Sequence, residues 1–276
     1  MSWHNEVNSG KRFEFGSNWK LFLENLSDEQ IKNSKKNLQE WLGDINGKTF
    51  LDIGSGSGIH SLAAKMLGAK VYSFDYDMQS VECTKYLKEQ YFPDDHDWHI
   101  EQGSILDKNY INSLGKFDIV YSWGVLHHTG FMWDAISNSL LPINNNGTIF
   151  IAIYNTQTYW TKYWTFVKKT YNSNLIMRFL WKYFYIVFNT SKGALKDLLL
   201  LKNPLKRYKE YKKQRGMSIY YDLIDWLGGY PFETAKPEEI FNFYKQHGFQ
   251  LEKIYTAGAG IACNEFLFKK TTECVE

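Results

Sequence analysis

The sequence of 276 residues has few features of a secreted, membrane-spanning or strongly charged protein. Its three cysteines, Cys83, Cys263 and Cys274, are too few and too scattered for a disulfide framework or a zinc site, which favours a reducing compartment. The N-terminal residues lack the apolar core of a signal peptide, and no stretch is long enough without charges to span a bilayer. The formal net charge of +2 by itself predicts no polyanionic partner. We therefore expect a cytoplasmic protein.

Apolar strand-like runs alternate with helix-like runs from Asn46 to Asn155. This alternation is typical of a parallel, doubly wound sheet. A helix and two further strands follow after residue 236, and they predict that the sheet ends in an antiparallel hairpin. We expect an α/β, Rossmann-like fold with seven strands, at residues 48–54, 69–75, 98–104, 116–123, 147–154, 249–256 and 264–270.

Four segments follow from this pattern: an N-terminal helical cap (1–45), a core (46–155), a helical insertion (156–235) and the C-terminal part of the core (236–276). In the cap, the SDEQ run is a capping box that begins a helix reaching about Trp41. The insertion is rich in aromatic residues and unevenly charged. Residues 155–215 hold fourteen basic side chains against two acids, so the near-neutral total conceals a basic insertion on an acidic core.

The run LDIGSGSGIH, residues 51–60, places three glycines directly after the first strand. A dinucleotide-binding turn needs glycine at the first, third and sixth positions, but the sixth position here is Ile59. Asp52 would also repel a phosphate bound at this turn. A cofactor with a cationic end and no phosphate, such as S-adenosylmethionine, removes that conflict. The alternative is a protein of Rossmann-like fold that binds a different nucleotide.

Asp75 ends the second strand, where adenosyl cofactors require an acid to accept hydrogen bonds from the two ribose hydroxyls. Asp77 is a possible competitor, but we expect it beyond the strand end and in solvent.

DIGSGSG, SFDYD, EQGSILD and FDIVYSWGVLHH occur in this order along the chain. Together they resemble the successive motifs of class I S-adenosylmethionine-dependent methyltransferases, and the LHH run is similar to the branch with quinone-biosynthesis and small-molecule O-methyltransferases. The resemblance covers the core and the C-terminal strands and leaves out the insertion. It implies S-adenosyl-L-methionine as cofactor, held by Asp52, Gly54, Ser55, Gly56 and Gly58 at its methionine part, by Asp75 and Tyr76 at the ribose, by Ser104 and Ile105 beside the adenine, and by Trp123 and Gly124 near the sulfonium.

The acceptor should lie beyond the fourth strand, where methyl transfer needs acceptor, methyl group and sulfur in line. The YSWGVLHH run there differs from the Asn/Asp-Pro-Pro-Tyr run that nucleic-acid amino-methylases of this fold carry. None of the cysteines is placed to act as the nucleophile that cytosine C5 methylation needs. The sequence has no acid between Asp118 and Asp134 that could bind a metal near the fourth strand. His127 and His128 are the candidate general bases, although either of them could instead cap a helix or pack structurally.

Aromatic and polar residues from three segments are candidates for the acceptor pocket. Phe15 and Trp19 could fold over the cofactor or simply fasten the N-terminal segment onto the core. Tyr154 and Asn155 end the fifth strand and face the same crevice by topology. Trp226 and Glu233 flank the Gly-Gly-Tyr-Pro turn that follows the basic insertion, where plain scaffolding is the alternative.

The helical runs at 160–171 and 175–188 place aromatics on one face and bases on another. The lysines could simply face water, they could hold the protein against an anionic membrane beside a lipid-linked acceptor, or they could bind the phosphates of a tRNA. We favour the membrane over the nucleic acid because the runs are so apolar. The sequence thus predicts a metal-independent methyltransferase that acts on an oxygen of a small or lipid-linked metabolite. A tRNA methyltransferase and a non-catalytic cofactor-binding protein are the alternatives.

Overall fold

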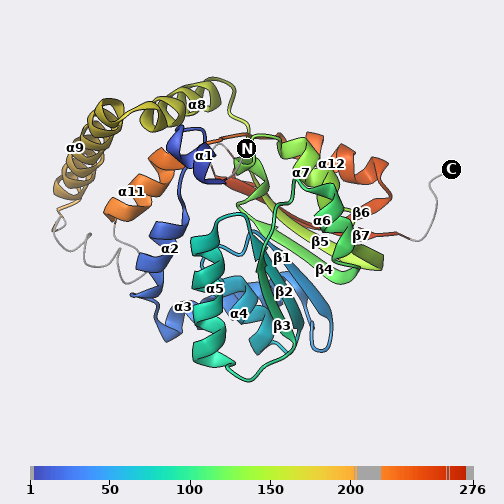
Figure 1. Ribbon diagram of the computed structural model, residues 1–276. Helices are drawn as coiled ribbons and strands as arrows, with labels where there is room; N and C mark the ends of the chain where they lie inside the picture. Colours follow the sequence, from blue (N-terminus) through green and yellow to red (C-terminus); the bar gives the residue numbers. More distant parts are fainter. Residues whose placement is uncertain (1–2, 202, 204–218, 259, 261, 272–276) are drawn as a thin grey trace.

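The computed structural model describes residues 3–201, 203, 219–258, 260 and 262–271. A seven-stranded sheet runs through the molecule in the order β3-β2-β1-β4-β5-β7-β6, with helices on both faces (Figure 1). Its strands are β1 (Thr49–Ile53), β2 (Lys70–Asp75), β3 (Trp98–Gln102), β4 (Phe117–Trp123), β5 (Ile143–Tyr154), β6 (Phe249–Tyr255) and β7 (Cys263–Lys270). The first five strands pair in parallel, whereas β7 pairs antiparallel with both β5 and β6. The predicted Rossmann-like sheet with a C-terminal antiparallel hairpin is confirmed.

Two groups of helices cover the two faces of the sheet. On one face, α6 (Lys108–Ser113), α7 (Met132–Ser139) and α12 (Pro237–Gln246) pack against the sheet. On the other face lie α3 (Asp28–Leu42), α4 (Ile59–Met66) and α5 (Met78–Tyr91). Because the central strands are buried on both sides, they are continuous apolar runs, and Phe50 and Phe150 are among their fully buried side chains.

Strand β5 begins four residues earlier than expected. Ile143 pairs with Phe117, while Thr148 pairs with Ile119, so the residues between form a bulge inside the strand instead of a turn before it. The NNNG run was expected to precede the strand because polar residues with glycine are typical of turns.

The N-terminal segment forms α1 (Trp3–Asn8), α2 (Gly16–Leu23) and α3. The predicted capping box is present, since the Ser27 N–H donates to Gln30 Oε1 at 2.8 Å and the Ser27 hydroxyl accepts from the Gln30 N–H at 3.4 Å. Between α1 and α2 the chain contacts the insertion, where the Phe13 N–H donates to the Tyr230 carbonyl oxygen at 2.9 Å.

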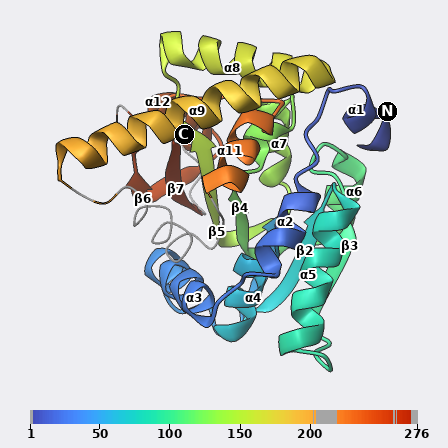
Figure 2. The same ribbon diagram turned by 90° about the vertical axis from the view of Figure 1, so that its left-hand side faces the viewer.

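The insertion forms α8 (Thr158–Ser173), α9 (Leu175–Leu199) and α11 (Ile219–Gly228). The short 3₁₀ turn η1 (Leu126–His128) belongs to the core and follows β4. Val167, Tyr171, Tyr185, Leu223 and Leu227 give it a small apolar core of its own. Figures 1 and 2 show α8 and α9 on the outside of the molecule, away from the sheet. Residues 204–218, which hold several of the predicted basic side chains, lie outside the described residues.

Candidate active site

A cleft of about 1400 Å³ opens at the carboxyl ends of the parallel strands. Its walls come from the glycine loop after β1, the ends of β2 and β4, the N-terminal segment and the insertion. Ligands of open α/β sheets bind at this edge, because the strand order reverses there and the loops diverge.

The glycine loop adopts a backbone that side chains disfavour. Gly54, Gly56 and Gly58 have φ angles of 76°, 55° and 82°. A Cβ atom on Gly54 would lie 2.4 Å from Val125 Cγ1, and one on Gly58 would lie 2.8 Å from Thr84 Cα. The loop therefore needs glycine both for its left-handed turns and for its close approach to neighbouring elements. Gly54, Ser55, Gly56 and Ile59 line the cleft.

Asp75 lines the cleft at the end of β2, as the sequence predicts for a ribose-binding acid. Its carboxylate accepts from the Gly56 N–H and the Asp77 N–H, each at 2.9 Å. Burial raises the pKa of Asp75 to about 6, although both backbone donors oppose that rise. Tyr76 also lines the cleft, and the Arg12 guanidinium lies 5.2 Å from the centre of its ring.

The expectation that Asp77 faces solvent is wrong. Asp77 is buried and caps α5, since its side chain accepts from the Gln79 N–H at 2.9 Å. It also accepts from the Gly16 N–H at 2.8 Å, which fastens the N-terminal segment onto the core. This contact spans 61 residues of chain, so no local pattern indicates it.

Asp52 lies away from the cleft lining. Its carboxyl is buried and accepts from the Ser61 hydroxyl at 2.5 Å, on α4. Burial raises its pKa to about 7, so the negative charge that argues against phosphate is only partly present at neutral pH. A direct contact of Asp52 with the methionine part stays a prediction.

The predicted adenine and sulfonium residues all line the cleft. Ser104 and Ile105 follow β3, and the Ser104 hydroxyl accepts from the Leu106 N–H at 3.2 Å. Trp123 ends β4 and Gly124 follows it, and Trp123 Nε1 donates to Glu265 at 3.0 Å. The fold thus brings four sequence-distant segments to one cleft.

The two candidate bases occupy different environments in η1. His127 is fully buried, does not line the cleft, and packs at a tilt of 45° against Tyr154 with 4.2 Å between ring centres. His128 lines the cleft, and its Nδ1 lies 2.6 Å from the Pro231 carbonyl oxygen. Since a carbonyl only accepts, Nδ1 carries the proton and Nε2 is left as the acceptor. Burial and the nearby Lys168 charge lower the pKa of His128 to about 3, so it is neutral at physiological pH.

Four of the six predicted pocket residues line the cleft: Phe15, Trp19, Tyr154 and Trp226. The other two lie outside its lining. Asn155 donates to the Gly258 carbonyl at 2.9 Å and accepts from Asn264 at 3.2 Å, bracing the end of β5. Glu233 accepts from the Met132 N–H at 3.1 Å at the start of α7. Glu233 thus stabilises the N-terminus of a helix and Asn155 the end of a strand. Their positions in the sequence do not reveal these structural roles.

Several cleft residues escaped the sequence analysis. Arg12 donates to the carbonyl oxygens of His128 at 2.9 Å and Thr129 at 3.3 Å, and forms an ion pair with Glu6 at 2.7 Å. Asn18 donates to Asp225 of the cleft wall, and Asp225 itself lies among the polar residues that the sequence predicts beside the Gly-Gly-Tyr-Pro turn. Asn189, Thr190 and Gly193 of α9 form part of the wall. Because the contacts of Arg12 with the core and of Asn18 with Asp225 join residues more than a hundred positions apart, only the run of aromatics around Phe15 gave any signal.

Lys168 of α8 is fully buried behind this wall. Its ammonium donates to the Trp226 carbonyl oxygen and lies 4.1 Å from the Trp226 ring centre and 4.9 Å from that of Phe232. Burial lowers the pKa of Lys168 to about 7 from 10.5, with Asp225 opposing the shift.

This lysine predicts a pH-dependent stability. Between about pH 7 and 10.5 the unfolded chain binds more protons than the folded chain, so the free energy of unfolding should rise with pH, by up to about 1.4 kcal/mol per pH unit. Lys168→Met should remove that rise in denaturant titrations run across this range. Lys169→Met, at an exposed neighbouring position, should keep it. An unchanged slope in Lys168→Met would contradict the assignment.

A family model described as a methyltransferase domain matches residues 22–184, which is more than half of the chain. The chain belongs to this family. The resemblance predicted from the motifs is thereby confirmed for the segment that holds the glycine loop, Asp75 and the two histidines.

Known proteins similar to this methyltransferase domain act on different acceptors. Ribosomal protein L11 methyltransferase of Helicobacter hepaticus is 33% identical over 156 residues, which cover 51% of this chain and 47% of that protein. The chain thus spans about half the length of this relative. Magnesium protoporphyrin IX methyltransferase from Synechocystis with bound SAH has a TM-score of 0.53 at 14% identity, covering 88% of this chain and 83% of that one. PKMT2 from Rickettsia typhi in complex with AdoHcy has a TM-score of 0.56 at 13% identity, covering 87% and 53%. These two structures support the fold alone.

Proposed function

We propose that the protein is an S-adenosylmethionine-dependent methyltransferase that methylates an oxygen of a small or lipid-linked acceptor. One observation carries the proposal. A single cleft joins the Asp75 and glycine-loop side to a wall that presents the neutral His128 among aromatic rings.

The residues present fit S-adenosylmethionine. Asp75 has a carboxylate at the strand end for the ribose hydroxyls, the glycine loop brings backbone close to the ligand, and the cleft is lined beside it by Ser104 and Ile105. The cleft is open beside Gly124, because a Cβ atom placed on this glycine would have no neighbouring atom within 4 Å. This space next to Trp123 leaves room for the sulfonium end of the cofactor. When bound, this cofactor supplies an electrophilic methyl group on a positively charged sulfur.

His128 can accept the proton that an acceptor hydroxyl releases. The Pro231 carbonyl fixes its tautomer, and Arg12 holds the backbone of its turn through the His128 carbonyl. A pKa of about 3 makes His128 a weak base, which suits an acidic hydroxyl such as a phenol or enol better than an alkyl alcohol. Phe15, with its ring 5.2 Å from His128, and Tyr154 exclude water from this position.

A protein acceptor is the second candidate, because the curated relatives are named as ribosomal protein L11 methyltransferases. The enzyme and radiolabelled S-adenosylmethionine can be incubated in separate reactions with each candidate acceptor: phenolic metabolites, a membrane lipid extract, ribosomal protein L11 and total tRNA. Label in an oxygen of a small or lipid molecule is the expected result. Label in L11 or tRNA alone would replace the proposed acceptor class. Binding of S-adenosylhomocysteine without any labelling would favour a non-catalytic cofactor-binding protein.

Phe15→Ala should raise KM for the labelled acceptor about tenfold, because one aromatic wall of the acceptor side is lost. The change in kcat should be smaller, since the tautomer of His128 is fixed by Pro231 and not by Phe15. Steady-state kinetics on Phe15→Ala measure this effect. The control is Phe131→Ala, which removes a largely exposed aromatic side chain at the N-cap of α7. Equal KM values in the two variants would remove Phe15 from the acceptor pocket.

A further inference from the structure

Helix α9 has two apolar sides, and one of them faces outward. Trp181, Tyr185 and Ile186 pack into the core of the insertion. On the outward side, Leu180, Phe184 and Val187 are 54%, 54% and 61% exposed. The same outward row holds further apolar side chains at helical spacing: Ile176, Phe179, Tyr183, Phe188, Leu195 and Leu198. A helix that is apolar on both sides normally has a partner on both sides.

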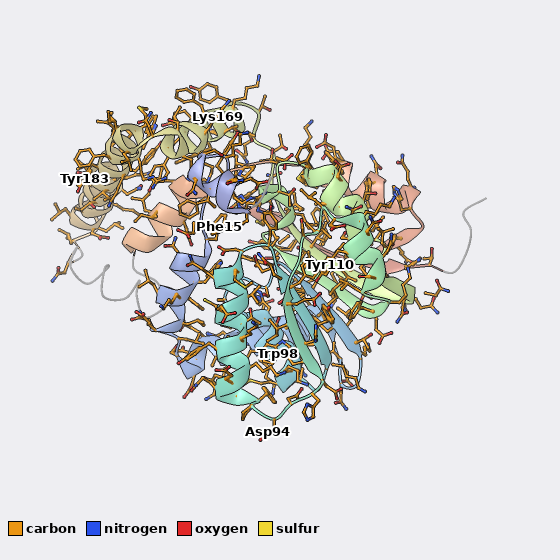
Figure 3. The ribbon with its side chains drawn as sticks, in the orientation of Figure 1. Phe15, Asp94, Trp98, Tyr110, Lys169 and Tyr183 are labelled. Atoms are coloured by element: carbon orange, nitrogen blue, oxygen red, sulfur yellow. The ribbon has the colours of Figure 1, made fainter. Side chains whose placement is uncertain are left out.

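The exposed charged side chains that the structure describes on α8 and α9 are all basic. Within residues 156–201, Asp197 is the acidic residue, and it is buried. Exposed bases lie on both helices, Lys162 and Lys169 on α8 and Arg178, Lys192 and Lys196 on α9. Figure 3 shows Lys169 and Tyr183 on the outer side of the insertion, away from the sheet. Lys192 lies beside Phe188 and Leu195 in a shallow apolar groove of this face.

This charge pattern distinguishes between two possible occupants of the face. A second copy of the chain docked about a twofold axis would bring the same lysines against one another without exposed acids to offset them. An anionic lipid surface supplies the complementary charge, and its apolar interior accepts the aromatic row. None of the described helices is long and apolar enough to cross a membrane, so α9 would lie along the interface.

The inner side of α9 reaches the active-site cleft. Asn189, Thr190 and Gly193 line the cleft, while Val187, Ser191 and Leu195 line the outward groove. The helical period of 3.6 residues places these two sets on opposite sides of α9. One helix thus forms both the wall of the cleft and the exposed apolar face.

We propose that the outward face of α9 docks on an anionic membrane and that the acceptor is an amphipathic molecule held in that membrane, which enters the cleft past α9. This inference rests on the proposed function, because the cleft must methylate an acceptor for such an entry to matter. It narrows the acceptor class from small or lipid-linked molecules to membrane-held ones.

Flotation with two kinds of vesicle tests the docking. The full chain should float with vesicles of phosphatidylcholine and phosphatidylglycerol in equal amounts, and much less with phosphatidylcholine alone. Phe184→Glu/Val187→Glu should lower the partition coefficient on the mixed vesicles at least about 30-fold, because two apolar side chains are lost and two like charges are added. Lys192→Gln/Lys196→Gln should lower it about 30-fold on mixed vesicles and little on phosphatidylcholine.

Matched controls lie on the opposite part of the molecule. Tyr86→Glu changes an equally exposed aromatic on α5, and Lys32→Gln/Lys36→Gln removes two exposed lysines on α3. Both control variants should float like the wild type. A chain that does not float with mixed vesicles overturns the proposal, as does a Phe184→Glu/Val187→Glu variant that floats normally. A wild type that dimerises in sedimentation experiments, and that these α9 changes render monomeric, would assign the face to a second copy.

The affinity for S-adenosylhomocysteine separates this proposal from the proposed function. All α9 variants should keep wild-type affinity in calorimetric titrations, since the outward face does not contribute to the cofactor side of the cleft. Loss of flotation with retained affinity supports the docking alone. A wild type that floats without binding S-adenosylhomocysteine would overturn the proposed function and leave a membrane-binding protein.

Discussion

Asp75→Ala should weaken binding of S-adenosylhomocysteine by about 100-fold, because the two hydrogen bonds that we propose between the ribose hydroxyls and this carboxylate would be lost. The Asp75 carboxylate lines the cleft and is fixed in place by the Gly56 and Asp77 N–H groups. Asp75→Asn keeps one oxygen acceptor and should lose less. Isothermal titration calorimetry of the purified variants measures the effect, and Asp94→Asn, at an exposed position beyond α5, is the matched control.

The affinity of the wild type should also depend on pH. Burial raises the pKa of Asp75 to about 6, so the charged form that accepts the hydroxyls dominates above pH 6. Below that pH the carboxyl must lose a proton on binding, and the affinity should fall up to about tenfold per pH unit. Asp75→Asn should lack this dependence. A variant with wild-type affinity, or with the same pH profile, would place the ribose elsewhere.

His128→Asn should lower kcat by about 100-fold or more, because the general base that we propose is lost while a donor toward the Pro231 carbonyl is kept. The affinity for S-adenosylhomocysteine should stay within about twofold, since the base contacts the acceptor and not the ribose side. Single-turnover methylation of the acceptor identified by the labelling experiment measures the chemical step.

His127→Asn is the comparison for this experiment. His127 is fully buried beside Tyr154, so its replacement should lower the unfolding temperature more than the activity of the folded fraction. Since the pKa of His128 is about 3, wild-type kcat should show no loss of a base between pH 8 and pH 5. A loss below fivefold in His128→Asn, with a large loss in His127→Asn, would reverse the two assignments.

The sequence predicted the sheet because its signals are local. Three of these signals are the alternation of apolar runs, the glycines of the first turn and the capping box at Ser27. Each acts within a few residues, because local hydrogen bonds or steric contacts favour one backbone conformation. The same signals predicted part of the cleft lining, since Gly54, Asp75 and Ser104 each lie at or just after the end of a strand of a parallel sheet. Parallel strands bring such ends to one edge without further information.

The acceptor side depended on packing between distant segments. Asp77 changed from an expected surface residue to a buried cap because Gly16 docks on it. Asn155 and Glu233 were drawn to a strand end and a helix start, and Arg12 reached the turn of His128 from the N-terminus. No periodicity records such contacts, because each is decided by which surfaces meet after the chain has folded.

The sequence by itself therefore determined the fold, the methyltransferase family and the gathering of Gly54, Asp75 and Ser104 at one edge of the sheet, since local geometry and strand order fix all three. Only the tertiary structure decided which histidine faces the cleft. It buried His127 in the core and held His128 at the wall through the Pro231 carbonyl, 103 residues away. It also showed that one side of α9 lines the cleft while the other is exposed. The sequence gives the apolar positions of the helix, but the packing of neighbouring elements decides which of them are covered.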